Sequence, residues 1–477
     1  MGKVKSQLIR GLTLTDTTAL VIGTVIGTGV FLKTAVMAQE VGTPILVLAA
    51  WAAAGLLSLA GALTYAELGA MMPSAGGEYV YLRHSYGDAS AFLYGWTRFV
   101  VAGSASIASL GAGLAIFLSV FLPLGGVWAS KTFTLFGQSV TWQFGAKSIV
   151  AVVAILLLSA INCLTVAFGG KVQSVLTVLK VAGIAVIVGG VFFFSPTTTW
   201  SNLTTPGGAR EWSGLAAFGT AMLAALWAYD GWNNMPMAAG EVRNPGRNLP
   251  RALIGGMITI VLIYCLANLA YFYALPFSEV VTSNSTQYRD AMPVAAKASQ
   301  GFLGVWGTKF VSVAFILSAL GALNGSILSN ARVPYAMARD GMFPESMGRL
   351  SAGTRVPVMA LAIQAVWSCV LALSGTYDQL TDCLLFVSWI FYGLVASSVF
   401  VLRRKLPDAE RPYKTWGYPL IPVVFVSVAT WLVINTFMQR RVESVVGLAL
   451  TAIGLPLYFY YRNRTSPPDA AAAQTAD

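Results

Sequence analysis

Gly27-Thr28-Gly29 interrupts the first apolar stretch of the chain, Leu14 to Met37, and Tyr229-Asp230-Gly231 interrupts the sixth, Ser213 to Gly240. A continuous membrane helix satisfies its backbone hydrogen-bonding groups internally, and a glycine-rich break in mid-membrane gives up some of those bonds. Broken backbone is tolerated at that depth only where it lines a cavity or is covered by protein. Two breaks at matching positions in the two halves of a chain therefore indicate a transporter binding site between them.

The composition is that of a membrane protein with many spans. Hydrophobic residues make up 56% of the 477 residues and charged residues 10%, whereas soluble proteins carry about 25% charged residues. The mean hydropathy is +0.69. About twelve apolar runs recur along the chain, each long enough to cross a hydrocarbon core of ~30 Å. We therefore expect an all-α polytopic protein with one transmembrane domain, residues 14–462.

The distribution of the net charge of +11 excludes a nucleic-acid partner and favours the lipid bilayer. If the N-terminus is inside, most Lys and Arg residues fall in the predicted cytoplasmic segments, as the positive-inside rule requires. We expect a protein of the cell (inner) membrane with a cytoplasmic N-terminus, residues 1–13, and a cytoplasmic disordered tail, residues 463–477. The four cysteines lie in predicted spans and indicate buried apolar residues, not disulfides.

The two halves are expected to form an inverted repeat, because an odd number of helices separates their equivalent elements. The first five-helix repeat covers residues 14–195 and the second covers residues 213–402. Two extra helices follow in residues 416–462. The longest outer loops are expected at residues 123–145, 195–212 and 275–304.

The break in the first span suits a zwitterionic ligand. The half-helix that begins after Gly27 presents free N–H groups and a positive dipole end, which favour a carboxylate. Glycine permits close approach to that backbone. The free carbonyls around Ile26 suit an ammonium group. The alternative interpretation is a helix-packing motif, since Gly23 and Gly27 also form a GxxxG pattern.

Two charged residues in the spans are further candidates. Asp230 is expected to face a wet or protein-lined cavity, because a central membrane Asp is costly; alternatively its carboxylate caps the broken helix. Lys180 lies about halfway along the fifth span and needs carbonyl or hydroxyl partners there; alternatively it only packs against carbonyls. Arg98, near the start of the third span, is interpreted as an interface residue. No metal cluster, catalytic constellation or nucleotide loop is found, so we expect no metal, no cofactor and no enzymatic activity.

Several motifs resemble those of the amino acid–polyamine–organocation transporters, and most closely those of the L-type amino acid transporter branch. Gly27-Thr28-Gly29-Val30-Phe31 is similar to the first-helix signature, and Glu241-Val242-Arg243-Asn244-Pro245 to the loop after the sixth helix. The other matching motifs are Tyr65-Ala66-Glu67-Leu68, Pro73-Ser74-Ala75-Gly76-Gly77-Glu78-Tyr79, Tyr335-Ala336-Met337-Ala338-Arg339-Asp340-Gly341 and Arg411-Pro412-Tyr413-Lys414 with Gly417-Tyr418-Pro419.

The resemblance implies a leucine-transporter fold and a set of site residues. It implies that the first-helix break holds the amino and carboxyl groups of an amino acid substrate, that Trp227 is the aromatic gate and that three residues of the sixth helix line the pocket. It also implies that Lys180 occupies the position that sodium takes in other members, with Ser326 as its hydroxyl partner. The implied substrate-binding residues are Ile26, Gly27, Thr28, Gly29, Trp227, Ala228, Asp230 and Asn233.

Two departures from the L-type pattern matter. Many members have a small residue in place of Asp230, and an Asp there resembles the branch that also accepts cationic amino acids. Animal members carry a cysteine for a heavy-chain subunit in the loop that corresponds to residues 123–145, which contains none here, so we expect no disulfide-linked heavy chain.

The resulting prediction is a sodium-independent amino acid transporter that works by alternating access, most simply an exchanger of neutral L-amino acids, with cationic L-amino acids as an additional substrate class left open. Four alternatives stay open at this point: a proton-coupled symporter that uses Lys180, a polyamine or amine exchanger in which Asp230 binds an amine, a membrane-embedded enzyme, and a non-transporting sensor.

Overall fold

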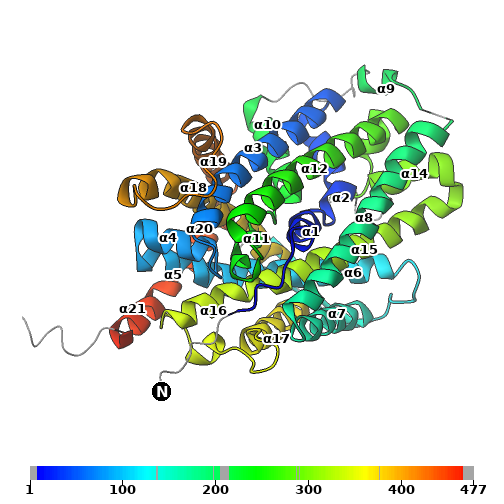
Figure 1. Ribbon diagram of the computed structural model, residues 1–477. Coiled ribbons are helices and arrows are strands. Elements are labelled where there is room, and N and C mark those ends of the chain that lie inside the picture. Colours follow the sequence, from blue (N-terminus) through cyan, green and yellow to red (C-terminus); the bar gives the residue numbers. More distant parts are fainter. Residues whose placement is uncertain are drawn as a thin grey trace, which may run out of the picture.

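The computed structural model describes residues 8–135, 138–196, 198–204, 214–285, 287–288, 291–374 and 377–465. Within these residues the chain forms a helical bundle (Figure 1). Nine helical segments of this described part are long and apolar enough to cross a membrane, and three shorter apolar helices, Ala146–Asn162, Leu215–Tyr229 and Val358–Ser374, bring the total to the expected twelve. The prediction of an all-α polytopic membrane protein is confirmed. The predicted disordered tail lies, from residue 466 on, outside the described residues.

The elements follow the predicted spans closely. The first half contains α1 (Leu14–Val25), α2 (Gly29–Val41), α3 (Pro44–Met71), α4 (Glu78–Tyr86), α5 (Asp88–Trp96), the π-helix η1 (Thr97–Gly103), α6 (Ser104–Leu118), α7 (Ala146–Asn162), α8 (Val166–Phe194) and the short α9 (Ser201–Thr204). The second half contains α10 (Leu215–Tyr229), α11 (Asn234–Met237), η2 (Ala239–Glu241), α12 (Pro245–Ala274), α13 (Phe277–Val281), α14 (Val294–Leu303), η3 (Gly304–Trp306), α15 (Gly307–Asn330), α16 (Arg332–Arg339), η4 (Glu345–Gly348), α17 (Val358–Ser374) and α18 (Tyr377–Lys405). The last helices are α19 (Leu420–Gln439), α20 (Arg441–Ala452) and α21 (Gly454–Thr465).

Both predicted breaks are present. The first span separates into α1, which ends at Val25, and α2, which begins at Gly29. The sixth separates into α10, which ends at Tyr229, and α11, which begins at Asn234. At the other end of α1, Thr13 and Asp16 form a reciprocal capping box that fixes where the helix begins.

The two broken spans lie inside the bundle. Helix α1 packs against α8, α12 and α15, and α2 packs against α10. Helices α3 and α12 run along each other beside them (Figure 1). This arrangement covers the breaks with protein on several sides, as the cost of bare backbone in lipid requires. The division into two inverted five-helix repeats stays a prediction.

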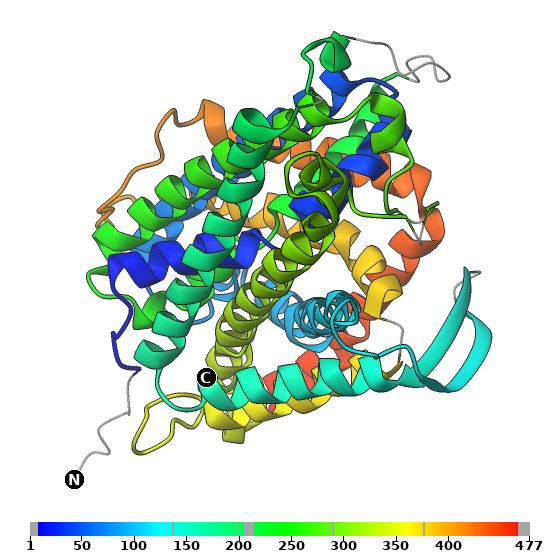
Figure 2. The same cartoon turned by 90° about the vertical axis from the view of Figure 1, so that its right-hand side faces the viewer.

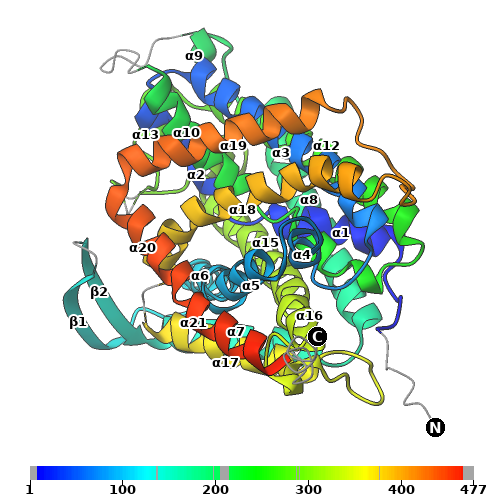
Figure 3. The ribbon, with the colours of Figure 1, turned by 90° about the vertical axis from the view of Figure 1, so that its left-hand side faces the viewer.

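The loop at residues 123–145 differs from the sequence expectation, because it contains an antiparallel hairpin of β1 (Val127–Leu135) and β2 (Gln138–Gly145). The hairpin projects from the helical bundle (Figures 2 and 3). Its strands are rich in Thr, Val and aromatic residues, which favour β-structure. An outer loop without regular structure was expected at these residues, and this local preference for strands was not used.

Candidate functional site: two broken helices in contact

The two breaks lie against each other. The Thr24 hydroxyl donates a hydrogen bond of 2.9 Å to the carbonyl of Gly231, which adopts a φ of +115° that favours glycine. The Tyr264 hydroxyl of α12 lies 3.0 Å from the carbonyl oxygens of both Val25 and Ala228. Bonds from side chains thus replace the helical bonds that each break gives up, and they join the two breaks into one structure.

The first turn of α2 is closely covered by α10. A Cβ atom at Gly29 would lie only 2.8 Å from Ala228 Cα and 3.5 Å from Trp227 Cζ3. Trp227 thus covers the start of α2, and the Lys33 ammonium lies 4.2 Å from the centroid of its ring. The N–H groups of Thr28, Gly29 and Val30 precede the first intrahelical bond of α2, so they are the free donors that the sequence predicted for a carboxylate.

Lys180 is fully buried and its ammonium group lies at the end of α1. It donates to the carbonyls of Gly23 at 2.8 Å, Ile26 at 2.7 Å and Ser318 at 3.0 Å. Three acceptors match the three donors of an ammonium group. The expectation that Lys180 needs carbonyl partners is met by these contacts; its role in place of sodium stays a prediction.

The hydroxyl beside Lys180 belongs to Ser318 rather than to the expected Ser326. The Ser318 hydroxyl donates to the carbonyls of Ile26 at 2.8 Å and Gly27 at 2.9 Å, so it shares the Ile26 acceptor with Lys180. Ser326 lies eight positions later on α15, about 12 Å further along a helix that rises 1.5 Å per residue. No hydrogen bond connects it to Lys180 among the described residues. The Asn-Gly-Ser pattern around Ser326 was the misleading signal.

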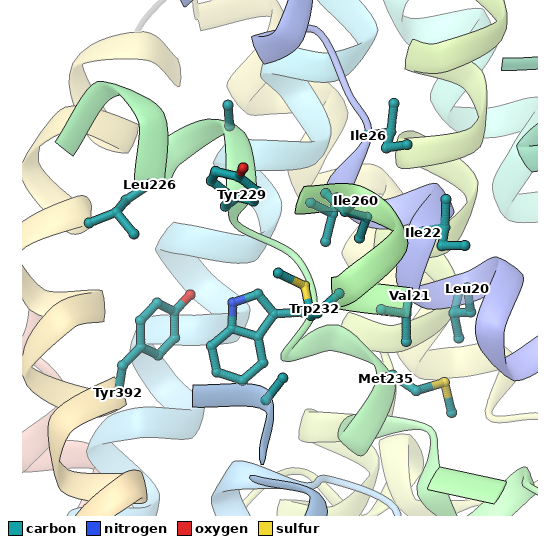
Figure 4. Close-up of a cluster of buried hydrophobic side chains, with 14 of the residues drawn as sticks. Leu20, Val21, Ile22, Ile26, Leu226, Tyr229, Trp232, Met235, Ile260 and Tyr392 are labelled. Carbon is teal, nitrogen blue, oxygen red and sulfur yellow. The ribbon is translucent and has the colours of Figure 1, made fainter. Parts of the chain in front are cut away.

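Asp230 lies in the break after α10, and its carboxylate contacts α18. The Tyr392 hydroxyl of α18 donates a hydrogen bond of 2.6 Å to Asp230 Oδ1. Asp230 is the C-cap residue of α10, and Asn233 occupies the N-cap of α11. The alternative in which the Asp230 carboxylate caps the second half-helix stays open. Figure 4 shows the non-helical segment beyond Tyr229, with Trp232 between it and Tyr392; the Trp232 and Tyr392 ring centroids are 6.1 Å apart.

Asn233 is almost completely buried and leads to a carboxyl group that the sequence analysis did not place in the site. Its Nδ2 donates to Glu78 Oε2 at 3.2 Å, while its Oδ1 has no partner among the described residues. The Glu78 carboxylate also accepts from the hydroxyls of Tyr65, at 2.8 Å, and Tyr94. Burial raises the pKa of Glu78. Glu78 therefore orients the Asn233 amide through its Nδ2. The Asn233 Oδ1 that remains is an acceptor for an N–H or O–H group of a ligand.

The location of Arg98 differs from the one predicted from sequence. It was interpreted as an interface residue, but its side chain reaches the interior, where it donates to Asn330 Oδ1 at 2.9 Å and to Asn234 Oδ1. It lies on the π-helix η1, a wider turn that is frequent at functional sites. The sequence shows only that Arg98 lies near the end of a predicted span. That position does not show whether its long side chain points to the membrane surface or to the interior of the protein.

Comparison with known proteins decides the family. The amino acid permease family matches residues 12–455. The chain belongs to this family. Among relatives of the permease, the serine/threonine exchanger SteT of Bacillus subtilis (strain 168) is 32% identical over 454 residues, 93% of this chain and 95% of the relative.

Two animal transporters are similar over nearly the same length. The human cystine/glutamate transporter is 29% identical over 96% of this permease and 87% of its own length. The mouse b(0,+)-type amino acid transporter 1 is 29% identical over 93% of this permease and 86% of its own length. The resemblance to the amino acid–polyamine–organocation superfamily is confirmed, and the permease is a multi-pass membrane protein related to amino acid exchangers and transporters.

Proposed function

We propose that this permease is a sodium-independent exchanger of neutral L-amino acids in the cell membrane, with both termini in the cytoplasm and without a disulfide-linked heavy chain. The observation that carries the proposal is the pair of breaks in contact, with free N–H groups at the start of α2 on one side and polar groups of the second break, including the unpaired Asn233 oxygen, on the other. Such a site matches the carboxylate and ammonium groups that all amino acids share.

The Lys180 contacts support sodium independence. Its ammonium occupies the carbonyl oxygens of Gly23, Ile26 and Ser318, which are the type of ligand that a sodium ion would need. Exchange is supported by the similarity to SteT, which is named as a serine/threonine exchanger.

The proposal is tested by counterflow in proteoliposomes. Vesicles that contain unlabelled L-alanine, L-serine or L-leucine should accumulate the labelled external amino acid, whereas empty vesicles and vesicles without protein should not. Accumulation that follows an imposed pH gradient without internal substrate would support the symporter instead. Failure of every amino acid tested, with a folded protein in the vesicles, would remove the proposed function.

Replacement of sodium by choline is expected to leave the initial rate of counterflow unchanged. The physical reason is that the Lys180 ammonium fills the carbonyl cluster and repels a second cation at the same place. The measurement compares matched vesicles at equal ionic strength in the two salts. A rate that requires sodium would contradict the assignment of Lys180.

Amino acid amides are expected to compete poorly with the parent acids. L-alaninamide should inhibit counterflow of labelled L-alanine at least about tenfold less well than L-alanine, because loss of a charge-assisted hydrogen bond to a helix N-terminus costs about 1.5–3 kcal/mol. The contacts concerned are the N–H groups of Thr28, Gly29 and Val30. Equal inhibition by amide and acid would show that the start of α2 does not read the carboxylate.

A further inference from the structure

Arg98 brings a positive charge to the second break and has no direct ionic partner in the part of the chain that the structure describes. Its guanidinium is held by the neutral side-chain oxygens of Asn330 and Asn234, and Asn234 is the first residue of α11. None of the ion pairs formed among the described residues includes Arg98. Its charge is therefore balanced only at longer range.

The guanidinium lines a small pocket that adjoins the same break. The pocket walls come from α5, η1 and α18, and its polar lining consists of Tyr94, Thr97, Arg98, Ser388 and Tyr392. The Tyr392 hydroxyl is the group that donates to Asp230. The pocket thus has a positive group in its wall and a carboxylate directly behind another part of that wall.

Two acidic groups adjoin the pocket that Arg98 lines, because Tyr392 of that pocket donates to Asp230 and Tyr94 donates to Glu78. Glu78 already accepts hydrogen bonds from Tyr65, Tyr94 and Asn233, which occupy both of its carboxylate oxygens. Asp230 accepts one side-chain bond, from Tyr392, and is only partly buried. Asp230 is therefore the acidic group whose charge a substrate would meet together with that of Arg98.

We propose that Arg98 is a specificity-determining residue that supplies the counter-charge of Asp230 and restricts the pocket to amino acids with uncharged side chains. A cationic side chain that approaches Asp230 meets the repulsion of Arg98, and an anionic side chain that approaches Arg98 meets the repulsion of Asp230. A hydroxyl or small apolar side chain meets neither. The inference deepens the proposed exchange of neutral amino acids and rests on it.

The first test replaces Arg98 by glutamine and by lysine. Inhibition of labelled L-alanine counterflow is measured with L-arginine, L-lysine and unlabelled L-alanine. Arg98→Gln is expected to improve inhibition by the cationic amino acids relative to alanine by about tenfold, the effect of removing one opposing charge from a partly desolvated site. Arg98→Lys keeps the charge and should keep the exclusion. Arg349→Gln removes an equal charge from an exposed position and serves as the matched control.

The second test leaves Arg98 in place and removes the opposing charge. Asp230→Asn should make L-glutamate and L-aspartate better inhibitors relative to L-alanine, by a similar factor, because Arg98 is then uncompensated. This variant keeps the inference testable if Arg98→Gln does not fold. Inhibition relative to L-alanine is therefore expected to improve for cationic amino acids in Arg98→Gln and for anionic amino acids in Asp230→Asn.

The outcomes separate this inference from the proposed function. Unchanged inhibition ratios in Arg98→Gln, or in Asp230→Asn if the first variant does not fold, with alanine exchange intact, would overturn the role of Arg98 alone. Strong inhibition of the wild type by L-glutamate that is lost in Arg98→Gln would also overturn it, since Arg98 would then bind an acidic side chain. Absence of exchange of any neutral amino acid by the wild type would instead remove the proposed function.

Discussion

Replacement of Lys180 by alanine is expected to reduce amino acid exchange by about a hundredfold or more. The change removes the ammonium donor that joins the buried carbonyls of Gly23, Ile26 and Ser318. The Ile26 carbonyl keeps the bond from the Ser318 hydroxyl, so the carbonyls of Gly23 and Ser318 carry the loss. An unsatisfied buried acceptor costs about 1–3 kcal/mol, and 1.4 kcal/mol corresponds to a tenfold change in an equilibrium. The affected carbonyls belong to the end of α1 and to α15, so the loss disturbs the first break directly.

Lys171→Ala is the matched control for this prediction. Lys171 lies on the same helix, α8, and is exposed. Its replacement removes the same side chain and charge but no buried contact, so exchange should stay within about twofold of the wild type, as for most surface substitutions. Ser318→Ala should fall between the two, because Lys180 still pairs with Ile26 when the hydroxyl is lost. An exchange rate equal to that of the wild type in Lys180→Ala would show that exchange does not require the Lys180 ammonium.

Much of the fold could be predicted because the membrane imposes strong rules on sequence. A span needs about twenty apolar residues, and a break in one is rare enough that Gly27-Thr28-Gly29 and Tyr229-Asp230-Gly231 could be located without coordinates. The hairpin at Val127–Gly145 obeys no such rule, since strands outside the membrane follow weaker and more local preferences.

Site residues could be predicted only where the residue type by itself requires particular neighbours in the membrane. A lysine in the middle of a span must find oxygen atoms, and Lys180 does. Which oxygen atoms it finds depends on how α8 and α15 pack, and here a short motif favoured Ser326 over Ser318. Glu78 lies between spans in the sequence, and its contact with Asn233 joins residues 155 positions apart. No local pattern in a single sequence contains that information.

Gly29→Ala is expected to abolish exchange and to lower the stability of the protein, whereas Gly27→Ala, two residues earlier in the same motif, should preserve the stability. A Cβ at Gly29 would lie 2.8 Å from Ala228 Cα, and backbone cannot move away as a flexible side chain can. Overpacking of this kind typically costs about 1–3 kcal/mol. At Gly27 the nearest atom, Ala322 Cβ, would be 3.8 Å away, which is ordinary contact.

The comparison isolates packing from backbone conformation. The structure records no positive φ at Gly27 or Gly29, so alanine is conformationally acceptable at both, and the two variants differ in the space available for one methyl group. Thermal unfolding of the purified variants in detergent, followed together with counterflow, provides the measurement. A strong loss of stability in Gly29→Ala alone shows that α2 and α10 must touch at this point for the site to form. Equal stability of the two variants would mean that the breaks can separate without cost, and that the close approach of Gly29 to Ala228 is not required for the fold.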